Sequence, residues 1–157
     1  MSVIKSKRGL SKMEFYHNTR KLRREMTEFI RREFGVHSRS NASRIDQTLP
    51  ADWYDEDIKE IADNVRLLLR NLLWNITAAN TIYAKNETEL QTRRHYQTEA
   101  IINCQQLIQE LQFAEDSLPI NAEKLLPYVA EIGFEITLLK GWRKSDNKIK
   151  MQLSADL

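Results

Sequence analysis

The sequence has little of what many protein classes need: one cysteine, four glycines, three prolines and three histidines in 157 residues. With Cys104 alone, no disulfide can form within the chain, which fits a reducing compartment. So few glycines and prolines cannot supply the turns of a β-sandwich or a β-barrel. Three scattered histidines and no cysteine pair argue against a metal site. We therefore expect an all-α protein without a metal or other cofactor.

Long apolar segments are also missing. No run reaches the roughly 18 residues that a membrane span needs, and no apolar signal core follows the basic first residues. With 41% hydrophobic positions the chain can still bury a sizeable core, and its length suits one domain. We expect a cytoplasmic protein with no membrane partner.

The net charge of +2 conceals an uneven distribution along the chain. Residues 1–44 hold 12 Lys and Arg against four Asp and Glu, whereas residues 45–139 hold seven against 16. Residues 140–157 are basic again, with five against two. Basic ends of this kind favour a polyanion or an acidic protein surface as partner, although solvated helix faces would have the same composition.

Hydrophobic periodicity and capping residues predict four helices, over residues 11–35, 52–83, 86–114 and 121–143. Ser11 and Asn86 each stand three residues before a glutamate, which is the pattern of a capping box. Because two of the connections are short, neighbouring helices should run antiparallel, as in a four-helix bundle spanning residues 11–144. The inward side chains expected from the periodicity are Phe15, Leu22, Met26, Phe29, Ile58, Ile61, Ala62, Val65, Leu68, Leu69, Leu72, Ile76, Ala79, Leu90, Ile101, Cys104, Leu107, Ile108, Leu111, Leu125, Val129, Ile132, Ile136 and Leu139.

Three segments are expected to lie outside the helices. Residues 1–10 form a basic N-terminal tail, residues 36–50 a long polar and basic loop, and residues 145–157 a flexible polar tail. A loop as long as 36–50 is unusual in a compact domain and is often functional or disordered.

Two of the expected helices are apolar on a second side as well. The side chains concerned are Leu67, Trp74 and Ala78 in the second helix and Phe134, Leu138 and Trp142 in the fourth. Exposed apolar stripes usually mark an interface. We expect self-association through these six residues, the alternative being that the loop 36–50 folds over one of the stripes.

Catalytic chemistry finds little support in the sequence. It has no phosphate-binding glycine loop and no nucleophile elbow, and a di-iron bundle would need a second Glu-x-x-His pair besides Glu14 and His17. Arg32 and His37 have the Arg-x-x-x-x-His spacing of HEPN-type ribonucleases, in which such a pair orients and protonates RNA oxygens. Cys104 falls on an inward stripe, where a core role is the simpler interpretation. We expect no catalytic residues and no enzymatic activity, with a HEPN-like ribonuclease as the less favoured alternative.

The fourth helix carries a pattern that resembles a known family. Glu131-Ile132-Gly133, followed by Leu-Leu-Lys-Gly-Trp-Arg-Lys at 138–144, is similar to the closing helix of the Avd-type four-helix-bundle family. That family includes the accessory variability determinant of diversity-generating retroelements and the rRNA intervening-sequence proteins. The resemblance covers about residues 12–145, mostly as a pattern of helices, and the Gly-Trp ending is its specific motif.

The resemblance implies a non-catalytic, basic protein that assembles into a barrel-like homopentamer. It also implies binding to a reverse transcriptase and to its template RNA, with DNA as a second nucleic-acid partner, in support of mutagenic retrohoming. An rRNA intervening-sequence protein of undefined role is the alternative within the family.

We expect nucleic acid to bind mainly on the arginine face of the first helix. Arg20, Arg24 and Arg31 share its outer side. Contacts from these residues to phosphate would be electrostatic and independent of base sequence. The full set of expected contacts is Arg20, Lys21, Arg23, Arg24, Arg31, Arg32, Arg39, Arg44, Arg93, Arg94, Arg143 and Lys144.

Overall fold

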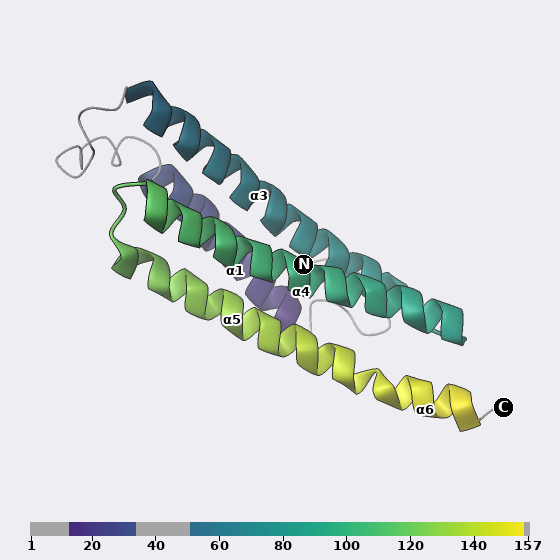
Figure 1. Cartoon of the computed structure of the whole chain (residues 1–157). Helices are drawn as coiled ribbons and strands as arrows, with labels where there is room; N and C mark the ends of the chain where they lie inside the picture. Colours follow the sequence, from purple (N-terminus) through teal and green to yellow (C-terminus); the bar gives the residue numbers. More distant parts are fainter. Residues whose placement is uncertain (1–12, 34–50, 156–157) are drawn as a thin grey trace, which may run out of the picture.

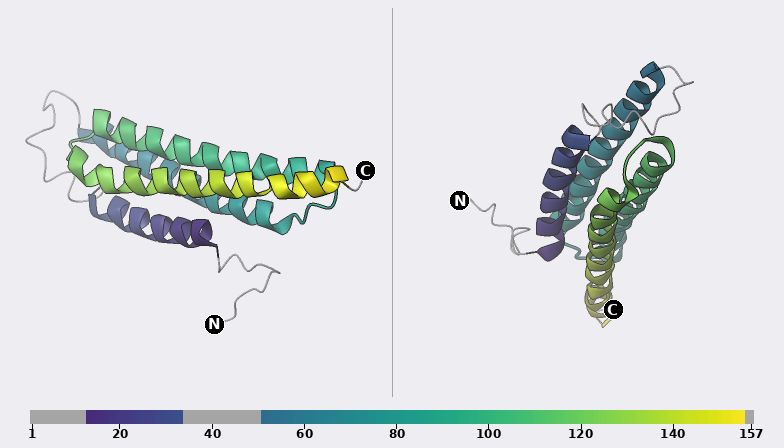
Figure 2. Two further views of the ribbon diagram at one scale, coloured as in Figure 1. Left: turned by 90° about the horizontal axis from the view of Figure 1, so that it is seen from below. Right: turned by 90° about the vertical axis from the view of Figure 1, so that its left-hand side faces the viewer.

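The computed structural model describes residues 13–33 and 51–155, and every regular element in these ranges is a helix. The elements are α1 (Glu14–Glu33), α3 (Ala51–Thr81), α4 (Glu87–Ser117), α5 (Ala122–Ser145) and α6 (Asn147–Ala155). The four long helices run up and down beside one another, and α6 continues the line of α5 (Figure 1 and Figure 2). Helices α1 and α4 each pack against α3 and α5, so α1 lies diagonally across from α4, and α3 across from α5. The predicted antiparallel helical bundle is confirmed.

Helix starts follow local sequence signals. The side chain of Asn86 accepts a hydrogen bond from the backbone N–H of Glu89 at 2.9 Å, as predicted for the start of α4. The returning bond of the capping box is displaced by one residue, because the Glu89 carboxylate accepts from the N–H of Lys85 at 2.9 Å. Asn121 caps α5 by accepting from the N–H of Glu123 at 3.0 Å. Ser11 lies outside the described residues.

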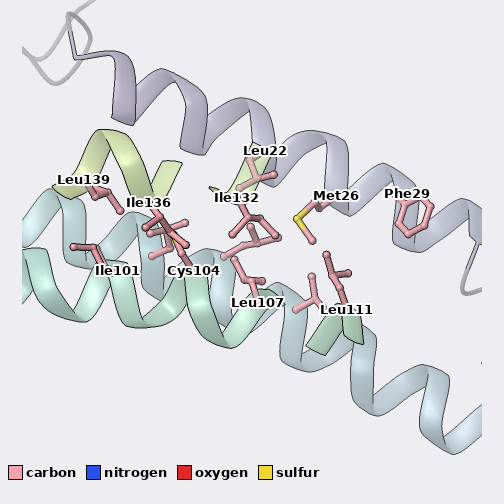
Figure 3. Packing of buried hydrophobic residues seen from close by; sticks show 14 of the residues in the cluster. Leu22, Met26, Phe29, Ile101, Cys104, Leu107, Leu111, Ile132, Ile136 and Leu139 are labelled. Carbon is pink, nitrogen blue, oxygen red and sulfur yellow. The ribbon is translucent and has the colours of Figure 1, made fainter. Parts of the chain in front are cut away.

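The core runs along the bundle axis and is made of the predicted apolar stripes. Leu22 and Met26 of α1 meet Leu107 of α4 and Ile132 of α5 in its centre, and all four are fully buried (Figure 3). The remaining predicted core residues are also buried, except for four that are partly buried at its margin: Ile58, Leu68, Ile108 and Val129. These apolar contacts are the main source of stability for a bundle of this kind.

A polar pair interrupts the seam between α3 and α4. The Asn75 side chain donates to Oδ1 of Asn103 at 2.7 Å. Asn103 is buried, and its own amide donates to Gln106 of the same helix at 3.3 Å. The buried amide is therefore hydrogen-bonded on both its oxygen and its nitrogen.

The C-terminal segment differs from the expectation of a flexible tail beginning at residue 145. It forms α6, which packs against α4. The turn between α5 and α6 is occupied by Asp146, which is buried. A buried carboxylate needs partners, and the side chains of α4 supply them.

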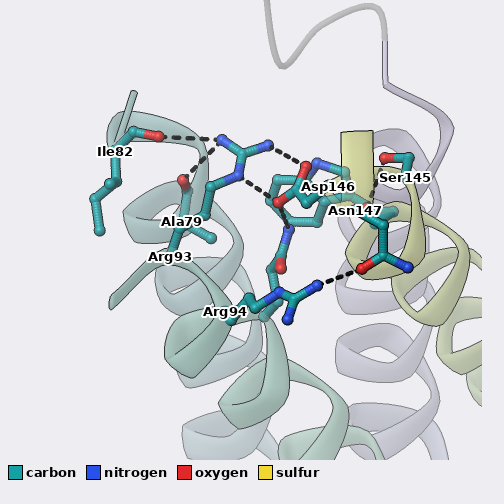
Figure 4. Close-up of polar contacts among 9 residues, drawn as sticks. Ala79, Ile82, Arg93, Arg94, Ser145, Asp146 and Asn147 are labelled. Carbon is teal, nitrogen blue, oxygen red and sulfur yellow. Dashed lines mark hydrogen bonds and ion pairs between the residues drawn. The ribbon is translucent and has the colours of Figure 1, made fainter. Parts of the chain in front are cut away.

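Arg93 and Asp146 form a buried ion pair that ties this turn to the bundle (Figure 4). Arg93 Nε donates to Asp146 Oδ2 at 2.6 Å, and its Nη2 donates to Oδ1 at 3.2 Å. Arg93 Nη1 also donates to the carbonyls of Ala79 and Ile82, at 3.3 and 3.1 Å. Gln97 donates to Asp146 Oδ2 at 2.9 Å. One guanidinium thus links α4 to the end of α3 and to the start of α6.

Trp142 belongs to the core, and its prediction as an oligomer contact is wrong. Its side chain is 8% exposed. Its ring stacks on Phe15 of α1 with centroids 4.2 Å apart, and the guanidinium carbon of Arg93 lies 5.2 Å from its centroid. The tryptophan joins α1, α4 and α5 at one level of the bundle.

Candidate functional site

Helix α1 carries six cations, which are called here the α1 basic surface. Its members are Arg20, Lys21, Arg23, Arg24, Arg31 and Arg32, and all six are exposed. Arg23 and Arg24 form no ion pair with any residue that the structure describes. A helix of this length extends about 30 Å. The predicted separation of an apolar inner side from an arginine outer side is confirmed for α1.

Neighbouring side chains orient two of these cations without burying them. The guanidinium of Arg20 lies 5.8 Å from the centroid of the Tyr16 ring. Lys21 lies between two carboxylates, 3.9 Å from Glu25 of its own helix and 3.7 Å from Glu131 of α5. Exposed pairs of this type contribute little to stability, and both side chains remain exposed at the surface.

Two residues of α4 that were expected to bind nucleic acid are engaged inside the protein. The guanidinium of Arg93 is 14% exposed and neutralises Asp146, so its prediction as a nucleic-acid contact is wrong. Arg94 is partly buried and donates to the side chain of Asn147 in α6. Both arginines hold the C-terminal segment on the bundle.

Neither Arg143 nor Lys144 joins the α1 basic surface. Arg143 donates to Thr98 of α4 at 3.1 Å, which places it on the side of the bundle away from α1. Lys144 is exposed at the end of α5. Arg39 and Arg44 lie outside the described residues.

The expected interface residues divide into an exposed and a partly buried group. Leu67 and Trp74 on α3 are 55% and 70% exposed, and Phe134 on α5 is 47% exposed, as predicted. Ala78 and Leu138 are partly buried. Because α3 and α5 are diagonal in the bundle, their outer faces point in different directions.

An open hollow of about 450 Å³ crosses the outer face of α3. It combines the exposed Trp74 with an arginine from the same helix, Arg70, which stands one turn earlier. Sequence reasoning missed Arg70, although the spacing of four residues was a visible signal. The full lining is Arg23, Arg70, Leu73, Trp74, Thr77, Ala78 and Tyr96.

A carboxyl group in the core was also missed. Glu135 of α5 is fully buried, and its Oε1 and Oε2 lie 2.6 Å from Thr19 Oγ1 and 2.8 Å from Asn18 Nδ2, both on α1. The pKa of Glu135 is raised to about 7, mainly by burial and in addition by the charge of Glu14, against the lowering effect of its hydrogen bonds to Thr19 and Asn18. Burial also raises the pKa of the Cys104 thiol, to which the charge of Glu135 contributes. The predicted core position of Cys104 is confirmed.

Other candidate features were sought over the same residues. No three His, Cys, Asp or Glu side chains of the described segments gather into a group that could hold a metal ion. None of the described helices combines the length and the apolar character needed to cross a bilayer. His37, one half of the candidate ribonuclease pair, lies outside the described residues. The chain matches no family model, no curated protein and no solved structure.

Proposed function

We propose that this chain is a non-catalytic nucleic-acid-binding protein of the Avd type. It binds template RNA, and also DNA, through the α1 basic surface. It assembles into a barrel-like homo-oligomer, a pentamer by resemblance, and acts as the accessory protein of a reverse transcriptase in a diversity-generating retroelement. Cytoplasmic location belongs to the same proposal.

The observation that carries the proposal is the concentration of exposed cations on α1. Arg20, Arg24 and Arg31 stand on the side of the helix opposite Leu22 and Met26, which are fully buried. The six cations lie between residues 20 and 32, over about 18 Å of helix, and such a row matches an extended polyanion better than it matches a small ligand. Each neutralised phosphate releases a counterion, which makes such binding steeply dependent on salt and tolerant of base sequence.

The exposed apolar side chains support assembly into a ring. Leu67 and Trp74 are on α3, whereas Phe134 is on the diagonal helix α5. One copy could therefore offer α3 to one neighbour and α5 to the other. Interfaces in which two different surfaces meet generate closed rings when the rotation between copies closes.

Charge reversal on α1 tests the nucleic-acid site. The variant Arg20→Glu, Arg24→Glu, Arg31→Glu should keep its helicity and its assembly, since none of the three side chains enters the core. Its affinity for single-stranded RNA should fall similarly for all sequences. The slope of log K against log salt should flatten by about 2, since each lost phosphate contact contributes roughly 0.7 on single strands.

A matched control separates the effect of the α1 basic surface on RNA affinity from the effect of net charge. Lys59, Lys85 and Lys148 are exposed on other parts of the protein, and changing all three to Glu alters the net charge equally. The control variant should keep most of the affinity and the original salt slope. Equal losses in both variants would refute a site on α1. If the α1 variant keeps its affinity for RNA but no longer binds a purified reverse transcriptase, α1 would instead be the surface that binds the polymerase.

The retroelement assignment has its own test. A reverse transcriptase gene with paired template and variable repeats beside the gene for this chain would support it. A gene for this chain placed inside a large-subunit rRNA gene would favour the intervening-sequence alternative.

A further inference from the structure

Among the described residues, Glu135 is the one carboxyl group whose two oxygens are both held by side chains of α1. It lies on the inner side of α5 and is fully buried. Its Oε1 pairs with the hydroxyl of Thr19 and its Oε2 with the amide of Asn18, at 2.6 and 2.8 Å. These two contacts join the buried acid of α5 to the side chains of two consecutive residues of α1.

The hydroxyl of Thr19 shows which protonation state fits this geometry. Its oxygen lies 2.8 Å from the carbonyl oxygen of Phe15 and 2.6 Å from Glu135 Oε1. A hydroxyl carries one hydrogen and can donate to only one of these acceptors. If Glu135 is ionised, one of the two oxygen pairs has no hydrogen between its atoms. If Glu135 is protonated, its O–H donates to Thr19 and Thr19 donates to Phe15, so that every contact is a hydrogen bond.

Within the described part of the chain, no cation lies close enough to Glu135 to perturb its pKa. Glu14 of α1 and the thiol of Cys104 on α4 are the ionisable groups that interact with it. No ionisable side chain of α3 among the described residues perturbs its pKa. On its own helix, Glu131 lies one turn away and is itself acidic.

Glu131 repeats the pattern at the edge of the same seam. Burial and the nearby carboxylate of Glu25 raise the pKa of Glu131, while Lys21 lowers it. Its Oε2 is buried and has no hydrogen-bond partner among the described residues. Two acids of α5 on consecutive turns therefore face α1 with a raised pKa, although Glu131 has the cation of Lys21 beside it.

We propose that the seam between α1 and α5 is a proton-operated latch, in which protonated Glu135 holds α1 on the bundle and ionised Glu135 weakens that contact. The sign follows from linkage: a carboxyl whose pKa is higher in the docked than in the undocked state takes up a proton on docking. Docking should therefore weaken as the pH rises from about 4.5 to about 7 and change little above that. A shift of this size permits a change in the docking equilibrium of about 100-fold.

Hydrogen exchange of the full chain measures the latch directly. The opening equilibrium of α1 amides, corrected for intrinsic exchange, should rise about 100-fold between pH 4.5 and pH 7.5, while amides in the centre of α4 change much less. In Glu135→Gln the amide can donate to Thr19 and accept from Asn18, so the pH dependence of α1 opening should be lost. Glu123→Gln, an exposed change on the same helix, should behave as the original chain.

A carboxyl titration keeps the proposal testable even if Glu135→Gln does not fold. The ¹³C carboxyl signal of Glu135 in the original chain should titrate near pH 7, well above the ordinary glutamate value of about 4.3. A midpoint near the ordinary value would overturn the latch. So would α1 opening that is independent of pH, or an unchanged pH dependence in Glu135→Gln.

Discussion

Replacing Arg93 with methionine asks how strongly the buried ion pair holds the C-terminal end of the bundle. Methionine keeps an apolar stem over Trp142 but removes the guanidinium that now makes four hydrogen bonds. Among the described residues, Gln97 would be the one side-chain donor left to the carboxylate of Asp146, which is 5% exposed. Removing one partner of a buried pair typically costs about 3–5 kcal/mol. We expect about 3 kcal/mol here because Gln97 still donates to the carboxylate.

Urea unfolding followed by far-ultraviolet circular dichroism measures this loss. Arg66→Met is the matched control, since Arg66 lies 3.6 Å from Asp63 in a pair whose side chains are 46% and 59% exposed. It should change the free energy of unfolding by no more than about 0.5 kcal/mol. In the Arg93→Met background, Asp146→Asn should recover about 1 kcal/mol by removing the uncompensated charge. The reasoning fails if Arg93→Met costs no more than Arg66→Met, or if Asp146→Asn makes that variant still less stable.

Three further predictions concern Trp74, Trp142 and the question of catalysis. Trp142→Ala should lower the free energy of unfolding by about 3–5 kcal/mol, because it empties a buried site between Phe15 and Arg93. Trp74→Ala should change the free energy of unfolding of the single chain by about 0.5 kcal/mol or less. Equal effects of the two variants in urea unfolding would contradict the buried position of Trp142 and the exposed position of Trp74. Trp74→Asp should reduce the assembled mass in light scattering while the helical signal persists, and a wild-type monomer at micromolar concentration would refute the assembly proposal. The purified protein should leave RNA intact. If the original chain cleaves RNA and both Arg32→Ala and His37→Ala abolish the cleavage, the non-catalytic role would be refuted in favour of a ribonuclease.

The helices and their inner faces could be predicted because they depend on local periodicity. The stripe through Leu22 and Met26 of α1 and the inward position of Cys104 needed only the 100° rotation per residue. The Asn86 cap was equally local. The same periodicity also marked Glu135, which stands three residues after Ile132 on the buried stripe, but a search for apolar residues passes over an acid.

The error at Trp142 has a geometric cause. Residues four apart on a helix are rotated by about 40°, so a line drawn through Phe134, Leu138 and Trp142 turns by about 80° over its length. The exposure follows this turn, from an exposed Phe134 through a partly buried Leu138 to a buried Trp142. What looks like one outer stripe in the sequence ends against α1.

The ion pair of Arg93 could not be predicted from the sequence. Its partner is 53 residues away, beyond the end of α5. From composition alone, an arginine near other basic residues is interpreted as a surface charge, and the polar residues after 145 are interpreted as a tail. Only the packing of α5 on α4 brings the two side chains together.

The amide pair of Asn75 and Asn103 has a consequence for the alignment of the two longest helices. The leucines and isoleucines of the seam are nearly interchangeable, so apolar contact alone permits α4 to slide along α3 by one turn, about 5.4 Å. A slide that brought Asn75 opposite Leu107 would leave the buried Asn103 without its partner, at a cost of about 1–3 kcal/mol. Leucine at both positions would give a bundle of similar stability but with two competing alignments of α3 and α4. The hydrogen bond therefore contributes to the choice of one alignment rather than to the overall stability.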